Sequence, residues 1–235
     1  MSRRITSRLL RFSGQPIIML MPLSSRRSLL VVSLIAVFAL ALYASKQYEP
    51  PKVSNADTYP AHDAHTNEKV TIAADIYNTE QKASIFRLKY LDKGVLPINL
   101  IITNEGGAPV ALTKMTVQLV AHERHAKLSP MEEQDIFRRM THAKRSDDVA
   151  RTTSPLPFPT KHKVGGLKQE DQDEVEHAMF QARAVEPNNT QSGFVFFDVS
   201  DLNDALAGAT LYVTGIRDGG GNELMYFEIP LDKAK

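Results

Sequence analysis

The run VLPINLIITN, from Val95 to Asn104, carries the clearest strand pattern of this chain. Its apolar side chains recur at every second position, which is the period of a strand with one buried face. Three of them would face a core: Ile98, Leu100 and Ile102. The next residues, 105–109 (EGGAP), have the composition of a turn, and 115–120 (MTVQLV) alternates again. We therefore predict that 95–104 and 115–120 are neighbouring antiparallel strands.

Further short strands are indicated on both sides of this pair. They are predicted at 70–74, 184–185, 193–199, 209–216 and 223–229, with a shorter one at 85–88. The segment 217–222 (RDGGGN) separates two of these runs and is rich in glycine, which favours a hairpin. About seven short strands in one domain are typical of a β-sandwich.

Helical patterns interrupt the strands in the middle of the chain. Ser129-Pro130-Met131-Glu132 has the composition of a helix start, with a capping serine, a proline at the first helical position and a glutamate at the third. Residues 167–182 have the spacing of a second helix, and 144–166 is rich in proline and basic residues. We predict a mainly β fold, a β-sandwich with a helical insertion at about 126–183.

Two segments carry a pattern that is known from one class of domain. The run 97–106, followed by Val110 and Leu112, has an apolar strand, an asparagine, a glycine turn and a second strand. Residues 186–199 (EPNNTQSGFVFFDV) combine a proline, small polar residues, a glycine and an aromatic strand. These segments resemble the immunoglobulin-like β-sandwich domains of uncharacterised bacterial membrane-anchored envelope proteins. The chain lacks the cysteine pair and the tryptophan of antibody-type domains. The resemblance implies an immunoglobulin-like fold and carries no functional residue to this chain.

One apolar segment near the N-terminus, Ser28 to Ser45 (SLLVVSLIAVFALALYAS), predicts a transmembrane helix. It has no charge, proline or glycine, and at about 1.5 Å per residue it reaches roughly 27 Å as a helix, which spans a bilayer. Six arginines and no acidic residue precede it, so the N-terminus is expected to stay in the cytoplasm. A cleaved signal peptide is the alternative, because Ala39-Leu40-Ala41 resembles a cleavage site and Arg26-Arg27 resembles a twin-arginine signal. Translation from Met21 instead of Met1 would still leave a basic segment before the helix.

These observations divide the chain into four parts. We expect a basic cytoplasmic N-terminus at 1–27, a transmembrane signal anchor at 28–45, a tether at 46–68 and the β-sandwich domain at 69–235. The tether is inferred from prolines among polar residues that show no helical or strand period. The protein is thus expected in the inner membrane of the cell as a single-pass protein, with its C-terminal domain periplasmic or extracellular.

Charge and cysteine content narrow the classes of function. Six of the 28 basic residues precede the apolar segment and all 27 acidic residues follow it, so the folded part is net acidic and unsuited to nucleic acid. The chain contains no cysteine, which excludes disulfides, cysteine zinc sites, a thiol nucleophile and a lipid-modified cysteine.

Two histidine pairs invite a metal hypothesis: His62 with His65, and His122 with His125. Neither pair has the H-E-x-x-H spacing that places two imidazoles on one helix face, and His122 and His125 would point to opposite faces of a strand. Both pairs are interpreted as solvated loop histidines. Five carboxylates on the second predicted helix are interpreted as a solvated face: Glu170, Asp171, Asp173, Glu174 and Glu176. We therefore predict no catalytic, cofactor-binding or metal-binding residue.

The resulting hypothesis is a non-catalytic, membrane-anchored envelope protein whose immunoglobulin-like domain serves protein interaction or scaffolding. We expect a protein partner at the helical insertion, because insertions into a compact fold tend to carry function. The membrane is the other expected partner, through 28–45. The alternatives are a metal-dependent hydrolase that uses His122, His125, His142 and acidic residues of the insertion, and a solute-binding domain exposed outside the cytoplasm.

Overall fold

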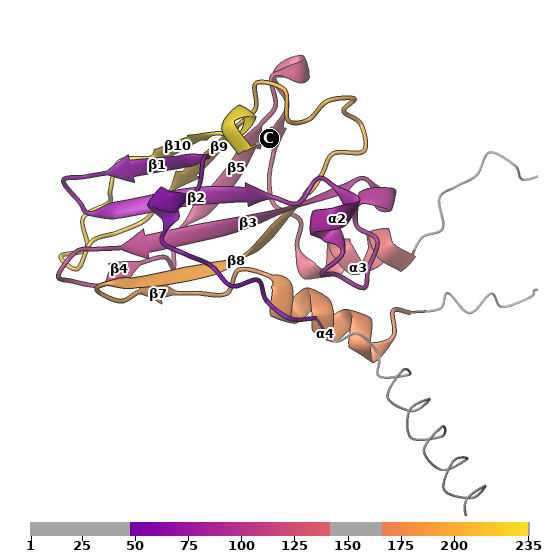
Figure 1. The fold of residues 1–235 in the computed structure, drawn as a ribbon, viewed down its shortest axis with the longest axis horizontal. Coiled ribbons are helices and arrows are strands. Elements are labelled where there is room, and N and C mark those ends of the chain that lie inside the picture. Colours follow the sequence, from indigo (N-terminus) through magenta and orange to yellow (C-terminus); the bar gives the residue numbers. More distant parts are fainter. Residues whose placement is uncertain (1–47, 142–165, 235) are drawn as a thin grey trace, which may run out of the picture. The chain divides into compact units, whose positions relative to one another are not determined.

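The computed structural model of the chain describes residues 48–141 and 166–234, which belong to one compact unit (Figure 1). Strands dominate this unit, and a few short helices accompany them. The elements in chain order are η1 (Ala56–Thr58), β1 (His62–His65), β2 (Val70–Ile76), α2 (Glu80–Ala83), η2 (Leu91–Lys93), β3 (Val95–Asn104), β4 (Val110–Ala111), β5 (Thr116–Val120), η3 (Glu123–His125), β6 (Lys127–Leu128), α3 (Glu133–Thr141), α4 (Gln169–Ala178), β7 (Ala184–Val185), β8 (Asn189–Asp198), β9 (Thr210–Thr214), β10 (Phe227–Pro230) and η4 (Leu231–Ala234).

The strands form two four-stranded antiparallel sheets and one small two-stranded sheet. The first sheet has the order β1-β2-β3-β8, the second has the order β10-β9-β5-β6, and β4 pairs with β7. The predicted mainly β fold is therefore confirmed. The predicted hairpin is confirmed as well, because β9 and β10 pair across the glycine-rich segment 217–222.

Two strand predictions were wrong. The segments 95–104 and 115–120 are not neighbours: β3 pairs with β2 and β8, whereas β5 pairs with β9 and β6 in the other sheet. Both runs alternate because both bury one face, and this pattern does not distinguish neighbours in one sheet from strands in facing sheets. Residues 85–88 form an irregular segment of turn and bend instead of a strand.

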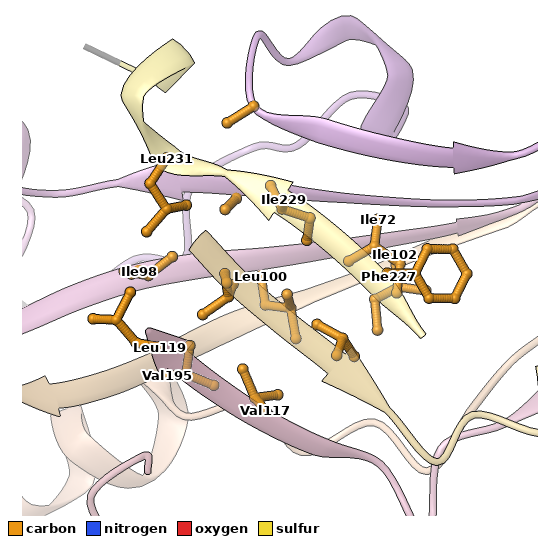
Figure 2. Packing of buried hydrophobic residues seen from close by; sticks show 14 of the residues in the cluster. Ile72, Ile98, Leu100, Ile102, Val117, Leu119, Val195, Phe227, Ile229 and Leu231 are labelled. Carbon is orange, nitrogen blue, oxygen red and sulfur yellow. The ribbon is translucent and has the colours of Figure 1, made fainter. Parts of the chain in front are cut away.

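The two large sheets face each other across a shared core, called the sheet core here (Figure 2). As predicted, the side chains of Ile98, Leu100 and Ile102 on β3 point into it and are fully buried. They meet Leu119 from β5 and Ile229 from β10. Close packing of such side chains supplies most of the stability that a cysteine-free domain can have.

The outer face of the first sheet is also buried, beneath the helices. The residues of this second cluster, called the aromatic cluster here, are Tyr77, Phe86, Tyr90, Val95, Ile136, Val175, Ala178, Phe194 and Phe196. Phe194 and Phe196 share the outer face of β8, and the helices α3 and α4 cover them with Ile136, Val175 and Ala178. The helices of the predicted insertion therefore build part of the interior.

The first predicted helix begins later than its sequence pattern indicated. Helix α3 begins at Glu133, whereas a start was predicted at 129–132. The backbone N–H of Met131 instead donates to the carbonyl oxygen of Phe196 at 2.7 Å, so this segment lies along the outer edge of β8. Pairing with a sheet edge has outweighed the local capping signal.

Much of the segment predicted as a tether, 46–68, belongs to the folded domain. Residues 62–65 form β1, which pairs with β2 in the first sheet. The preceding residues 48–61, called the N-terminal strap here, bury Ala56 and Ala61 completely. The tether prediction failed because isolated small side chains produce this burial, and they leave no periodic pattern in the sequence.

Several predictions lie outside the described residues. These are the cytoplasmic segment 1–27, the transmembrane helix 28–45 and most of the proline-rich segment 144–166. Among the residues that the structure describes, no helix is both long and apolar enough to cross a membrane.

Candidate functional site

A groove of about 1320 Å³ opens where β8 ends, between α3 and η2. Its apolar lining comes from Leu91, Met131, Val199 and Leu202, and charged side chains of both signs stand among them. Small-molecule sites usually measure about 300–1,000 Å³, so this groove has room for a larger group. Part of its lining, from Ser129 to Arg139, belongs to the predicted helical insertion, and the rest comes from 91–94 and 198–202.

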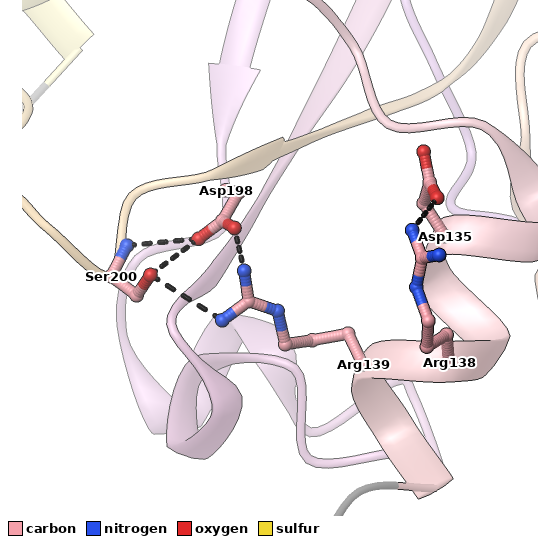
Figure 3. A network of polar contacts seen from close by, with 5 residues as sticks. All are labelled: Asp135, Arg138, Arg139, Asp198 and Ser200. Carbon is pink, nitrogen blue, oxygen red and sulfur yellow. Dashed lines mark hydrogen bonds and ion pairs between the residues drawn. The ribbon is translucent and has the colours of Figure 1, made fainter.

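An ion pair and its hydrogen bonds tie α3 to the end of β8 at the edge of the groove (Figure 3). The guanidinium of Arg139 pairs with the carboxylate of Asp198. Asp198 also accepts from the backbone N–H of Ser200 at 3.1 Å and from its hydroxyl at 2.7 Å. Arg139 reaches the same hydroxyl at 3.4 Å. This triangle fixes the position of α3 relative to the first sheet.

A second ion pair in the groove lies open to solvent. Arg138 pairs with Asp135 one helical turn away, and their side chains are 67% and 46% exposed. Exposed pairs at this spacing typically contribute only about 0.2–0.5 kcal/mol, so a partner's carboxylate can replace Asp135 at little cost. Arg138 is therefore the side chain of the groove best placed to recognise an incoming group.

The wall of the groove opposite α3 depends on a glycine. Gly94 ends η2 with φ of +68°, a conformation that favours glycine. A Cβ at this position would lie 2.7 Å from the Cβ of Ser200, which is too close. The carbonyl oxygen of Gly94 accepts from the backbone N–H of Val199 at 2.8 Å. Ser200 thus lies close against Gly94 at the end of η2 and contacts Arg139 of α3 on its other side.

The carboxylates of α4 were predicted to form a solvated face, and for Glu174 this prediction was wrong. This carboxylate is buried and holds the helix in place. Glu174 is 2% exposed and accepts the backbone N–H groups of Arg87 at 2.6 Å and Leu88 at 3.1 Å. Burial raises the pKa of Glu174, although these hydrogen bonds oppose the shift. The Arg87 guanidinium pairs with Glu170 at 2.6 Å and Asp171 at 3.5 Å.

The first histidine pair lies in β1 and is half-buried, so its assignment to a solvated loop was wrong. The ring of His65 stacks on Phe227, with centroids 3.9 Å apart. The Nδ1 atom of His62 lies 2.5 Å from the carbonyl oxygen of Tyr59. The carboxylate of Asp63 accepts the backbone N–H of Glu228 at 2.8 Å. These groups join β1 to its surroundings, and each serves packing.

The second histidine pair lies closer together than predicted. His122 and His125 flank a turn in which Arg124 has φ of +59°, so their rings meet edge to face with centroids 5.9 Å apart. Glu123 accepts hydrogen bonds from Asp204 and Asn203, and these bonds lower its pKa. His142 lies outside the described residues. Across 48–141 and 166–234, no group of three His, Asp or Glu side chains is arranged to hold a metal ion.

None of the residues that form the groove was predicted from the sequence to be a functional residue. Arg138 and Arg139 follow each other on one helix, and Asp198 and Ser200 stand at the end of an aromatic strand. The aspartate and serine two positions apart form a recognisable local turn. Only the fold, however, brings Arg139 to that turn, because it lies 59 and 61 positions away from Asp198 and Ser200.

Comparisons with known proteins find two similar solved structures. No protein-family model matches the chain, and no curated protein does. A Bacillus subtilis protein proposed to be a lipoprotein (ycdA) aligns with a TM-score of 0.35 and 13% identity over 74% of this chain. The chain spans 39% of that protein's length. A conserved hypothetical protein from Bacillus anthracis aligns with a TM-score of 0.29 and 12% identity, over 72% of this chain and 95% of its own.

Proposed function

We propose that this chain is a non-catalytic, membrane-anchored protein of the cell envelope, and that its immunoglobulin-like β domain binds a protein partner at the groove between α3 and η2. The groove is the observation that carries this proposal. It is larger than a usual small-molecule site and combines apolar side chains with an exposed, weakly paired Arg138. Arginine among apolar contacts is typical of residues that dominate protein interfaces.

The groups of the groove support binding rather than chemistry. Arg139, Asp198 and Ser200 are engaged with one another and fix the wall of the groove. A catalytic base instead needs to face the substrate with its proton-accepting atom free. A wall that is fixed in advance favours binding, because less conformational entropy is lost when the partner arrives.

The anchor and the finer fold assignment rest on the sequence. The apolar segment 28–45, with six arginines before it, supports a single-pass topology with the domain outside the cytoplasm. Two facing antiparallel sheets around one core are compatible with an immunoglobulin-like sandwich that carries α3 and α4 on one outer face.

A crosslinking experiment tests the groove. A photoreactive amino acid replaces Met131 in the full-length protein in intact cells, and the control carries it at Met225, which is exposed and lies outside the groove. We expect a discrete adduct from position 131 only, and we expect Arg138→Glu in the same chain to reduce its yield at least several-fold. Equal adducts from both positions, or an adduct unaffected by Arg138→Glu, would overturn the proposal.

Metal analysis separates this proposal from the hydrolase alternative. The purified protein is expected to contain no stoichiometric transition metal. One equivalent of zinc that is lost on replacing His122 or His125 would favour a metal-dependent hydrolase instead.

A further inference from the structure

The N-terminal strap begins with an aromatic contact. The ring of Tyr48 stacks on Phe86 of the aromatic cluster, with centroids 5.7 Å apart and ring planes within 1° of parallel. Burial raises the pKa of Tyr48, which agrees with a ring removed from water. Such a stacked pair contributes roughly 0.5–1.5 kcal/mol beyond the area that it buries. The chain is therefore bound to the domain from Tyr48 onward.

Two further contacts hold the strap along the outer face of the first sheet (Figure 1). Ala56 is fully buried against Ala73 and Ile101, and its backbone N–H donates to the hydroxyl of Thr103 at 2.9 Å. The carbonyl oxygen of Ala61 accepts from the backbone N–H of Ala74 at 2.9 Å. The strap is thus bound at its start, its middle and its end.

These contacts limit how far the domain can move from the membrane. This step rests on the proposed anchor at 28–45. Only Lys46 and Gln47 lie between Ser45 and Tyr48, and three peptide steps extend at most about 10 Å. A free tether over 46–68 would extend up to about 80 Å, with a root-mean-square length of about 26 Å. From this difference we infer that the strap holds the domain at the membrane surface, and that the groove takes the exposed part of an integral membrane protein.

A protein partner fits this position better than the lipid surface does. Helix α4 lies next to the strap, because Tyr48 packs against the aromatic cluster to which Val175 and Ala178 of α4 belong. Glu176 on the same helix is exposed, and like charges on anionic headgroups repel it. A domain held beside the bilayer meets membrane proteins at high effective concentration, whereas a component beyond about 50 Å is out of reach.

Energy transfer to the membrane tests the position of the domain. Because the chain has no native cysteine, Lys89→Cys gives a single label in the exposed loop next to Phe86. The full-length labelled protein is placed in vesicles that carry an acceptor on their lipid headgroups. A Gly-Ser linker of about 20 residues is inserted between Ser45 and Lys46, and the control carries the same linker between Gly106 and Gly107.

We expect the linker after Ser45 to lower the transfer efficiency at least twofold, and the control linker to leave it unchanged. Tyr48→Ser is expected to lower it as well, whereas Tyr48→Phe, which keeps the stacked ring, should not. Unchanged transfer with the linker after Ser45, in a protein that sediments with membranes, would overturn the inference while the anchor stands. A protein recovered in the soluble fraction after cleavage would overturn the anchor, and the inference with it.

Two further outcomes decide the class of partner. Energy transfer that rises with the fraction of anionic lipid would indicate lipid binding and would overturn the choice of a protein partner.

The adduct formed at position 131 should stay with membranes after alkaline extraction, and its yield should fall several-fold when the linker after Ser45 is present. The anchor of this chain would by itself keep any adduct in the membrane fraction. The extraction is therefore repeated after a protease has cut the domain from its anchor. An adduct partner that is then soluble would overturn the assignment to an integral membrane protein.

Discussion

The carboxylate of Asp63 in β1 accepts the backbone N–H of Glu228 in β10 at 2.8 Å, across 165 positions of the chain. This hydrogen bond connects the edge strand of the first sheet with the edge strand of the second. The His65 ring on Phe227 reinforces the same edge. The two sheets are therefore closed against each other at one side by residues that sequence reasoning had assigned to a tether.

Asp63→Ala should destabilise the domain by about 1–3 kcal/mol, because it leaves the backbone N–H of Glu228 without its partner. Chemical denaturation of the soluble part beginning at Tyr48 measures the free energy of unfolding. The matched control is Asp201→Ala at an exposed position, which should change the free energy by less than about 0.5 kcal/mol. Equal effects of the two substitutions would contradict the role given to Asp63.

A protein that begins at Asn67 should be much less stable than one that begins at Tyr48. The shorter protein lacks β1 and the strap, and so exposes the surfaces that Ala56 and Ala61 cover. Thermal melts of the two proteins make the comparison. Indistinguishable melting temperatures would show that the strap adds nothing to the fold.

Phe196→Ala should cost about 3–5 kcal/mol, because this fully buried side chain fills the aromatic cluster between β8 and the helices. Met225→Ala serves as the control, since Met225 is 69% exposed. If Phe196→Ala removes only the helical signal in circular dichroism and leaves the strands intact, the helices fold independently of the sheets.

The coupling between Arg139 and Asp198 should exceed that between Arg138 and Asp135. Both pairs are partly exposed, so we expect a coupling energy of about 0.5–1 kcal/mol for the first and about 0.3 kcal/mol for the second. The first pair also organises Ser200, which adds to its coupling. Double-mutant cycles with alanine measure both values, and the reverse order would exclude Arg139 as the residue that fixes α3.

The pH dependence of stability should differ in sign between Glu174 and Glu123. Burial raises the folded-state pKa of Glu174 above 4.5, so its stabilising contribution is full below that pH and is lost as the pH rises through the folded pKa. Hydrogen bonds from Asp204 and Asn203 lower the pKa of Glu123, so its contribution is present above the unfolded pKa and is lost as the pH falls.

Unfolding free energies at several pH values between about 3 and 7 test this contrast. Relative to the natural protein, Glu174→Gln should gain stability as the pH rises, and Glu123→Gln should gain stability as the pH falls. Parallel curves for the two variants would refute the assignment.

The sequence alone predicted correctly those structural features that a local pattern determines. Alternation identified β3 and placed Ile98, Leu100 and Ile102 in the core, and the glycines at 219–221 identified the β9–β10 hairpin. These features depend on residues close together in the chain, so their signals survive without knowledge of the fold.

What the sequence left open depends on contacts between distant residues. Nothing in 115–120 indicates which sheet β5 joins, and Ala56 has no periodic neighbours that would mark it as buried. In the sequence Glu174 resembles the other carboxylates of its helix, and only its contacts with Arg87 and Leu88, which lie 87 and 86 positions away, distinguish it. The groove also depends on contacts between distant residues, because its arginines lie on α3 and its Asp198 lies at the end of β8.

The outer edge of β8 illustrates a different consequence of the helical insertion. The carbonyl oxygens of Phe194 and Phe196 accept the backbone N–H groups of Phe180 and Met131, which come from the two sides of the insertion. An uncovered aromatic edge strand is a template on which other chains add as strands and aggregate. By occupying these acceptors, the insertion covers backbone groups of β8 to which a second chain would otherwise bind as an added strand.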